Sequence, residues 1–418
     1  MLFRVKNLGL IDEAEIKLDG ITVITGKNNV GKSTIGRMLY CVNNVFMRDS
    51  VENMKMNRIR RLITNNFRDL SMKARRSLDS AIKKTDLLPS LLYDIDVSLH
   101  SLNDFFEQLF ESEGVSFDND MIEVLKGDIL KVVNKRGDSV ISELFHIARN
   151  VNFSGDLYNI YGKNYSTEIE LKSHNLDIHI VIKTSKNPLM VGESTKPSFE
   201  EAIYIENPYV VHDADKLETD SDFLLTFDSR QRIVQLLTDN SGVDFLEKEE
   251  IGLEIGGILE KISGCAPGEL VKDSPLTNKL VYEEENRRFD LVNVSSGVKT
   301  FAILKSLLTN GKLKRNGMLI LDEPEVHLHP EWQLVFAEIL VLLQKQFNLT
   351  TVISTHSVYF LMAIEDYSKM HQVDKNCNYY IIERKEGRSS CRDCTDTLNE
   401  IYQHFADAFD TLHNEVRK

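Results

Sequence analysis

The sequence contains little cysteine and no arrangement that suggests a disulfide framework. Five cysteines, an odd number, are spread through a chain of 418 residues, so reduced thiols are the simplest interpretation. Cys391 and Cys394 have the spacing of half a zinc site, and Cys377 or His371 could supply a further ligand. A second close pair of ligands is missing, so unligated thiols are the preferred interpretation.

Long apolar runs are also missing. The run 339–343 is among the longest and falls far short of the roughly 20 residues that span a bilayer, so no membrane segment is expected. Arg4 and Lys6 interrupt the N-terminal segment before the apolar stretch of a signal peptide can form. Export is therefore not indicated, and the cytoplasm is the expected location.

Positive charge is in deficit, with 50 Lys and Arg against 64 Asp and Glu and a net charge of −14. Such a chain repels nucleic acid and anionic membranes on average, so a nucleic-acid site would have to be a local patch. The stretch Arg48–Lys84 is rich in Lys and Arg and is the one candidate for such a patch. A solvated helical face is the favoured interpretation of this stretch, and a nucleic-acid partner is the alternative.

Apolar spacing predicts an α/β chain. Strands are predicted where apolar residues alternate or run together, at 14–18, 21–25, 169–171, 178–182, 202–205, 318–321 and 351–354. Helical spacing covers 35–42, most of 43–150 and 222–262. A helix with Pro330 at its start separates the last two strands, as expected for parallel α/β units.

One glycine-rich run lies between a predicted strand and a predicted helix and matches the phosphate-binding P-loop without a gap. Its glycines let backbone N–H groups turn toward phosphates, Lys32 supplies charge for the β and γ phosphates, and the Ser33 hydroxyl can ligate Mg²⁺. A glycine-rich turn that binds nothing is the weaker alternative. The predicted nucleotide-binding residues here are Gly26, Asn28, Asn29, Gly31, Lys32, Ser33 and Thr34.

Two adjacent acids follow the apolar strand that ends at Leu321. Asp322 is predicted to hold Mg²⁺ through its water shell, and Glu323 is predicted to act as general base or to orient the attacking water. Taken alone, an Asp-Glu pair after a strand is more often a helix cap or a solvated strand end. Together with the P-loop, the catalytic interpretation is preferred.

The chain resembles ABC-type ATPases of the SMC, RecF and OLD-like branch over residues 1–41 and about 290–384. The segment 294–299 looks like the signature loop of that family, in which Ser295, Ser296 and Gly297 would face the γ-phosphate bound by the opposite subunit. A serine-rich helix N-terminus is also a ready anion site, although an ordinary helix cap is the alternative.

Two further motifs support the resemblance. The run Asp322 to Pro330 is similar to the extended Walker B and D-loop of the OLD-like and RecF-like proteins and differs from transporter ATPases. The run Ser354-Thr355-His356-Ser357 resembles the switch region, in which His356 would contact the γ-phosphate. His356 is therefore predicted to be catalytic together with Glu323.

The sequence also departs from the family pattern. No glutamine loop is recognisable, although Glu206 and Asn207 lie at a plausible strand end. Phe3 is a candidate by position and chemistry for stacking on adenine. The middle of the chain, about 42–290, matches no motif, and no Asp-x-Asp pair of a TOPRIM nuclease follows His356. The chain is therefore not expected to cut nucleic acid by itself.

The resemblance implies an α/β fold, an ABC-type P-loop ATPase head with an antiparallel β subdomain and a helical insertion. It also implies ATP and Mg²⁺ as cofactors, ATP hydrolysis, and a homodimer or higher homo-oligomer that regulates a separate protein effector, as in anti-phage defence. A DNA-binding ATPase of repair or chromosome maintenance is the alternative. The expected parts are 1–41 of the head, the helical insertion 42–150, a β-rich part 151–215, a helical segment 216–290 and the C-terminal head 291–418.

Overall fold

The computed structural model describes residues 1–66, 119–157, 166–173, 178–184, 190–192, 199–216, 226–239, 245–274 and 277–406. The chain forms two compact units, one of Met1–Arg48, Phe145–Ser221 and Leu225–Lys418 and one of Asp49–Leu144 with Asp222–Leu224. Residues 67–84 of the predicted basic patch lie outside the described residues. Within the described part of the chain, no helix combines the length and apolarity needed to cross a membrane.

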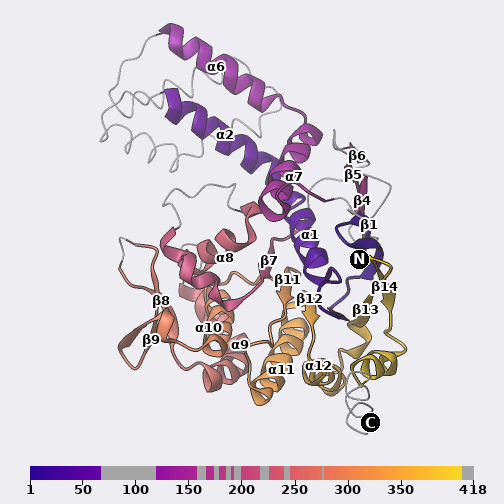
Figure 1. Cartoon of the computed structure of the whole chain (residues 1–418). Coiled ribbons are helices and arrows are strands. Elements are labelled where there is room, and N and C mark those ends of the chain that lie inside the picture. The colour runs from indigo at the N-terminus through magenta and orange to yellow at the C-terminus, as the bar shows by residue number, and fades with distance from the viewer. Residues whose placement is uncertain are drawn as a thin grey trace. The chain divides into compact units, whose positions relative to one another are not determined.

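The larger unit is built on an 11-stranded mixed sheet with the order β6-β5-β4-β1-β2-β14-β13-β3-β12-β11-β7 (Figure 1). Five neighbouring strands at one end are parallel to one another. Most of their residues are buried, as expected for parallel strands that are covered on both faces. These strands are β13 (Cys377–Lys385), β3 (Ile21–Gly26), β12 (Thr350–Thr355), β11 (Met318–Asp322) and β7 (Ala202–Ile205).

The other end of the sheet is antiparallel. In β4, buried and half-buried residues alternate, which is the pattern of a strand with one face toward the core. The strand β14 (Arg388–Asp393) pairs antiparallel with β13 and parallel with β2, and so joins the two ends. The antiparallel strands are β1 (Leu2–Leu8), β2 (Ile11–Lys17), β4 (Thr167–Ser173), β5 (Ile178–Thr184) and β6 (Met190–Gly192). The predicted α/β fold with an antiparallel β part is confirmed.

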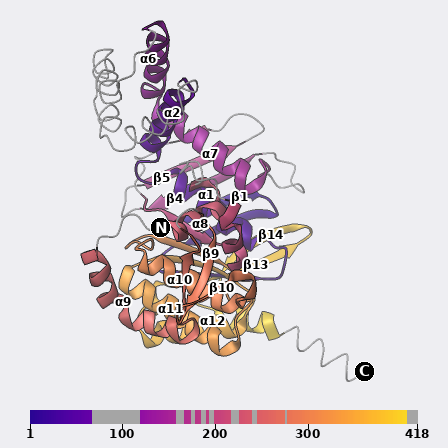
Figure 2. The ribbon, with the colours of Figure 1, turned by 90° about the vertical axis from the view of Figure 1, so that its left-hand side faces the viewer.

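Helices pack on the parallel strands and on one another. Helix α1 (Lys32–Val45) packs on β3, β7, β11 and β12, whereas α10 (Ser296–Thr309) packs on α8 (Ser229–Thr238) and α9 (Phe245–Cys265). Helix α11 (Pro330–Phe347) packs on α12 (Val358–Met370), and Figures 1 and 2 show these two helices side by side. Helix α11 begins with Pro330, as predicted, because proline lacks the N–H that the first turn leaves unpaired.

A separate three-stranded antiparallel sheet lies beside α10. Its strands are β8 (Glu269–Lys272), β9 (Leu280–Glu284) and β10 (Arg287–Asp290), so the range 216–290, expected to be helical, also contains strands. Glu285 and Asn286 join β9 to β10 with φ of 49° and 62°, which suits a two-residue hairpin turn. The strands are short, and every residue of β10 is exposed, so no alternation marked them in the sequence.

Short 3-10 helices connect several of these elements. They are η1 (Pro208–Lys216), η3 (Leu291–Asn293) and η4 (Asp374–Asn376). The first follows β7, and the second leads into α10, so both lie next to segments that the sequence marked as part of the site.

The second unit contains α2 (Ser50–Asn66) packed on α6 (Asn119–Val133), and α7 (Gly137–Phe153) begins in it. Two basic residues of the predicted patch are engaged inside this unit. Lys55 donates to the carbonyl oxygen of Val133 at 2.7 Å, and Arg58 forms an ion pair with Glu143. The described part of the patch therefore offers less free positive charge than its sequence suggested.

Candidate functional site

The P-loop connects β3 directly to α1. Asn29 has a φ of 60° and Gly31 a φ of 106°, so the loop turns through left-handed conformations before the helix begins at Lys32. Among the described residues, no side chain caps the N-terminus of α1, and its first turn contains no acid. The first N–H groups of the helix are therefore available to an anion.

Glycine is required at both ends of this loop. A Cβ at Gly26 would lie 2.4 Å from the carbonyl oxygen of Ile382, and one at Gly31 would lie 2.9 Å from Cγ1 of Ile11. Both contacts are shorter than real side chains show, so a larger residue would displace the loop. Asn28 and Asn29 are exposed, and Ser33 and Thr34 are half-buried at the start of α1. The loop and its residues thus fit a nucleotide phosphate chain.

Lys32 lies inside this loop with 5% of its surface exposed. Its Nζ donates to the carbonyl oxygens of Gly26 and Lys27, both at 3.1 Å. Burial lowers the pKa of Lys32, while the charges of Glu323 and Asp322 act in the opposite direction. The ammonium group of Lys32 is therefore held in place by two backbone carbonyls of the P-loop.

Asp322 ends β11 and accepts hydrogen bonds on both carboxylate oxygens. Ser354, opposite it in β12, donates to Oδ1, and the Tyr204 hydroxyl donates to Oδ2 at 3.2 Å. With Ser33 in the P-loop, Asp322 offers the hard oxygen donors that Mg²⁺ prefers. The predicted metal residues therefore fit a magnesium ion chemically.

Glu323 lies next to Asp322 in an unusual backbone conformation, with a φ of 47°. Its N–H donates to the carbonyl oxygen of Ser354 at 3.0 Å, which fixes the turn against β12. Its Oε1 lies 2.7 Å from Nε2 of His356 and 3.9 Å from Nζ of Lys32. A non-glycine residue held at positive φ is typical of functional sites.

His356 completes a cluster with Lys32 and Glu323, because its Nε2 also lies 2.6 Å from Nζ of Lys32. Burial and then the charge of Lys32 lower the pKa of His356, so the ring is neutral near pH 7. Since Nε2 of a neutral ring offers either a proton or a lone pair, only one of its two contacts is a hydrogen bond at a time. The sequence predicted all three residues, and the structure brings them together.

Glu325 holds the backbone of the switch region, a role that the sequence did not indicate. Its side chain is 3% exposed, and its Oε1 accepts from the Thr355 hydroxyl and, at 3.0 Å, from the N–H of His356. Burial raises the pKa of Glu325. Gln333 adds a second link, because it accepts from the Ser357 hydroxyl at 2.8 Å and donates to the Leu328 carbonyl oxygen at 3.1 Å.

The signature segment lies on a different helix from the P-loop. Ser295 is exposed and caps α10, accepting from the N–H of Val298 at 3.3 Å, and Ser296 begins the helix. A Cβ at Gly297 would lie 3.1 Å from the His327 carbonyl oxygen and 3.2 Å from the Trp332 ring, so glycine lets the signature pack on the D-loop. The cap expected as an alternative is present, and it leaves the Ser295 side chain at the surface.

Two further residues considered from the sequence have other roles. Phe3 is fully buried in β1, so its ring is not available to stack on a base. Glu206 forms ion pairs with Arg37 and Arg230, both at 2.8 Å; burial opposes its charge, but these cations outweigh burial and lower its pKa. Glu206 is therefore engaged by protein cations.

Two cavities among the described residues of the larger unit differ in their relation to this cluster. A cavity of about 160 Å³ is lined by Asp322 and Glu323 and by apolar side chains such as Ile303, Leu321 and Phe336. It borders the two acids on the side of α10.

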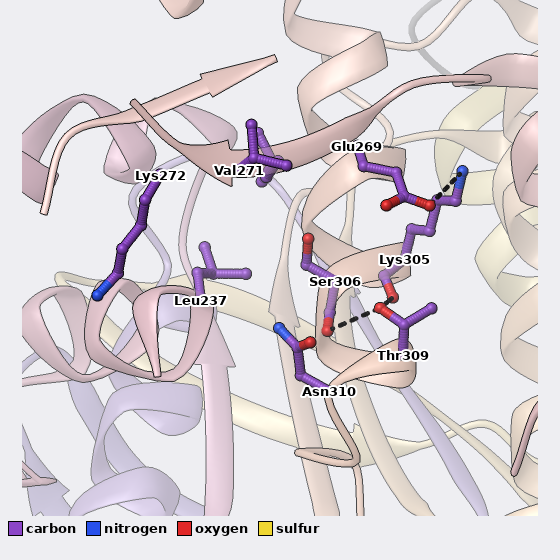
Figure 3. A pocket seen from close by; sticks show the side chains of 9 residues that line it. Leu237, Glu269, Val271, Lys272, Lys305, Ser306, Thr309 and Asn310 are labelled. Atoms are coloured by element: carbon purple, nitrogen blue, oxygen red, sulfur yellow. Dashed lines mark hydrogen bonds and ion pairs between the residues drawn. The ribbon is translucent and has the colours of Figure 1, made fainter. Parts of the chain in front are cut away.

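The other cavity, of about 290 Å³, lies between β8, α8 and α10 (Figure 3). The Lys305 ammonium at its wall donates to the carbonyls of Pro267 and Gly268, both at 3.2 Å, and lies 3.7 Å from Glu269. Its charge is already satisfied, and none of the residues that line this cavity belongs to the P-loop or the acid pair.

The parallel strands, the P-loop and the acid pair define the class of P-loop nucleotide-binding domains. The chain belongs to the AAA ATPase domain family, which matches residues 1–361. No curated protein matches the chain.

Several solved structures are similar to this chain. An Smc head bound to the C-winged helix domain of ScpA has 12% identity and a TM-score of 0.43, with 94% of this chain and 96% of that chain covered. The SMC head domain from Thermotoga maritima has 11% identity and a TM-score of 0.39, covering 94% and 97%. An Smc head domain with an extended coiled coil bound to the C-terminal domain of ScpA, derived from Pyrococcus furiosus, has 11% identity and a TM-score of 0.36, covering 100% and 99%. Similarities of this size say nothing about activity.

Proposed function

We propose that this protein hydrolyses ATP with Mg²⁺ and that Glu323 is its general base. The observation that carries the proposal is the convergence of Lys32, Glu323 and His356, with contacts of 2.6 Å and 2.7 Å at Nε2 of the histidine. A P-loop lysine, a carboxylate and a neutral imidazole at one point suit the transfer of a phosphoryl group to water.

Each residue has a part in this proposal. The P-loop backbone and Lys32 would bind the β and γ phosphates, and Ser33 and Asp322 would hold Mg²⁺, which when bound neutralises phosphate charge. Glu323 would take a proton from the attacking water, and His356 would contact the γ-phosphate. Glu325 and Gln333 would keep the His356 backbone in position.

We further propose that two copies share each nucleotide in a head-to-tail dimer. Helix α1 packs on the parallel strands while α10 packs on α8 and α9, and Ser295 is exposed at the start of α10. A signature serine placed in this way suits a nucleotide held by a second copy, as the resemblance to ABC-type ATPases implies.

For the biological role, we favour regulation of a separate protein effector in anti-phage defence. Support comes from the run Asp322 to Pro330, which resembles the OLD-like proteins. A DNA-binding ATPase of repair or chromosome maintenance is the second candidate. The pairing of Lys55 and Arg58 inside their own unit weakens it.

The test of ATP binding is Lys32→Ala, because this change removes the charge directed at the phosphates. ATP affinity measured by calorimetry should be lost, and phosphate release should stop. Lys17→Ala is the matched control, since Lys17 is an exposed lysine on β2 that pairs with Asp19. Unchanged ATP affinity in a folded Lys32→Ala variant would refute the P-loop assignment.

A further inference from the structure

We propose that Tyr204 is a positioning residue for Asp322 and supplies, from β7, the polar group that a glutamine loop would otherwise bring to the metal side of the site. This inference rests on the proposed function, because it assigns Asp322 to the metal. The sequence does not indicate it, because Tyr204 lies inside an apolar strand, and the polar residues at the end of that strand are Glu206 and Asn207.

The register of the sheet places Tyr204 on the correct face. Tyr204 of β7 pairs with Ile320 of β11, two residues before Asp322, so all three side chains lie on one face of the sheet. The tyrosine is 2% exposed, and its hydroxyl lies 3.2 Å from Oδ2 of Asp322. The contact is therefore built into neighbouring strands of the core.

The direction of this hydrogen bond follows from its two partners. The Asp322 carboxylate can only accept, so the Tyr204 hydroxyl donates its proton to Oδ2. Arg37 interacts electrostatically with both Tyr204 and Asp322. Glu206 keeps Arg37 in place at 2.8 Å, and Arg230 holds Glu206 from α8, also at 2.8 Å.

The ring of Tyr204 packs against α1 at Gly36. A Cβ added at Gly36 would lie 3.4 Å from Cε2 of Tyr204 and 3.1 Å from Cγ2 of Ile320, so glycine leaves room for the ring. The Tyr40 ring lies beside it, with centroids 6.1 Å apart. Helix α1, which carries Lys32 and Ser33 at its start, thus packs on the residue that orients Asp322.

These contacts have a chemical consequence for the metal position. With Ser354 donating to Oδ1 and Tyr204 to Oδ2, the Asp322 carboxylate cannot rotate without losing a hydrogen bond. Groups that orient a metal-binding side chain in this way typically change metal affinity or activity by about 10- to 100-fold when they are removed. Tyr204 should therefore matter for the metal and much less for the phosphate chain.

The test is Tyr204→Phe, which removes the hydroxyl and keeps the ring. We would measure Mn²⁺ affinity by electron paramagnetic resonance with a non-hydrolysable ATP analogue bound, and analogue affinity separately in EDTA. We expect Mn²⁺ affinity to fall about 10-fold, with unchanged analogue affinity in EDTA. The Mg²⁺ concentration for half-maximal hydrolysis should rise by a similar factor.

Tyr40→Phe is the matched control. Tyr40 is a buried residue of α1, and its hydroxyl donates to the Thr226 carbonyl oxygen at 2.6 Å. It should lose a similar amount of stability with no shift in Mn²⁺ affinity. If Tyr204→Phe does not fold, Gly36→Ala keeps the hydroxyl but crowds Ile320 and the Tyr204 ring, and Mn²⁺ affinity should fall about 3-fold, as for one weakened hydrogen bond.

Equal Mn²⁺ affinity in folded Tyr204→Phe and wild type would overturn the inference, as would an equal shift in Tyr40→Phe. For the fallback variant, wild-type affinity in Gly36→Ala would do the same. A wild-type protein that binds neither the analogue nor Mn²⁺ would instead refute the proposed function, so the two failures are distinct.

Discussion

At the scale of single residues, Glu325 joins the D-loop to the switch histidine. Its Oε1 accepts from both the Thr355 hydroxyl and the His356 N–H, while within the described residues its buried Oε2 has no hydrogen-bond partner. Burial raises its pKa, so the folded state tolerates this group best when it is protonated. The carboxylate of Glu325 thus positions the backbone of His356, and its burial in the ionised form lowers the stability of the folded protein.

Replacing Glu325 with alanine tests this interpretation. Two donors would lose their acceptor, and we expect the free energy of unfolding to fall by about 1 to 2 kcal/mol. Because the folded pKa is raised, the wild-type group favours folding most at low pH, so the loss should be larger near about pH 5 than near about pH 8. Glu325→Gln, which keeps an acceptor oxygen, is the control. A loss of equal size in both variants, measured by urea unfolding, would argue against these hydrogen bonds.

The residues that the sequence predicted are those whose chemistry follows from local order. Gly26 to Ser33 and Asp322-Glu323 each lie between a strand and the next element. Their position in the fold can therefore be predicted from the sequence. Tyr204 and Glu325 could not be predicted, because their roles depend on strand register and on contacts with distant segments. Phe3 is a case in which the sequence misled. Its position in the sequence suggested that it stacks on adenine, but its ring is fully buried and cannot do so.

At the scale of elements, the C-terminal segment from Leu398 belongs to the core of the larger unit as far as the structure describes it. Ile401 is fully buried, and Leu398 and Phe405 pack on the core around it. Phe409 and Leu412, which continue the apolar stripe in the sequence, lie outside the described residues. The described residues of this segment therefore cover the core of the larger unit.

Truncation after Thr395 should therefore destabilise the protein. Removing Ile401 and its neighbours exposes apolar core, and we expect a loss of about 3 kcal/mol or more with a tendency to aggregate. Truncation after Ala406 is the control, because the difference between the two truncations isolates residues 396–406. Equal melting temperatures would mean that this segment is not needed for the fold and would favour a docking role.

The strand order is the element-scale feature that sequence patterns left open. Apolar spacing identified β3, β7, β11 and β12, but it could not reveal that β14 joins β2 to β13 across the sheet. The hairpin of β9 and β10 was missed because every residue of β10 is exposed, and the buried residues of the short strand β9 are consecutive and do not alternate.

At the scale of the whole molecule, the central proposal is a site shared between two copies. Ser295→Arg should block hydrolysis while leaving ATP binding by the P-loop intact, since α1 and α10 pack on different elements. Mixing Ser295→Arg with Lys32→Ala should then restore activity that neither variant has alone, because a mixed dimer contains one intact pair of P-loop and signature. Normal hydrolysis by Ser295→Arg would show that the signature takes no part in the site.

The role of Glu323 and the nucleotide-dependent dimer are tested most directly on the Glu323→Gln variant. Light scattering with ATP and Mg²⁺ would be measured together with phosphate release. Glutamine keeps the size of the side chain and removes its basicity, so phosphate release should fall by about 100-fold or more. ATP should then persist, and the variant should accumulate as an ATP-bound dimer. Wild-type phosphate release would contradict the role of Glu323, and association that does not depend on ATP would contradict the nucleotide-dependent dimer.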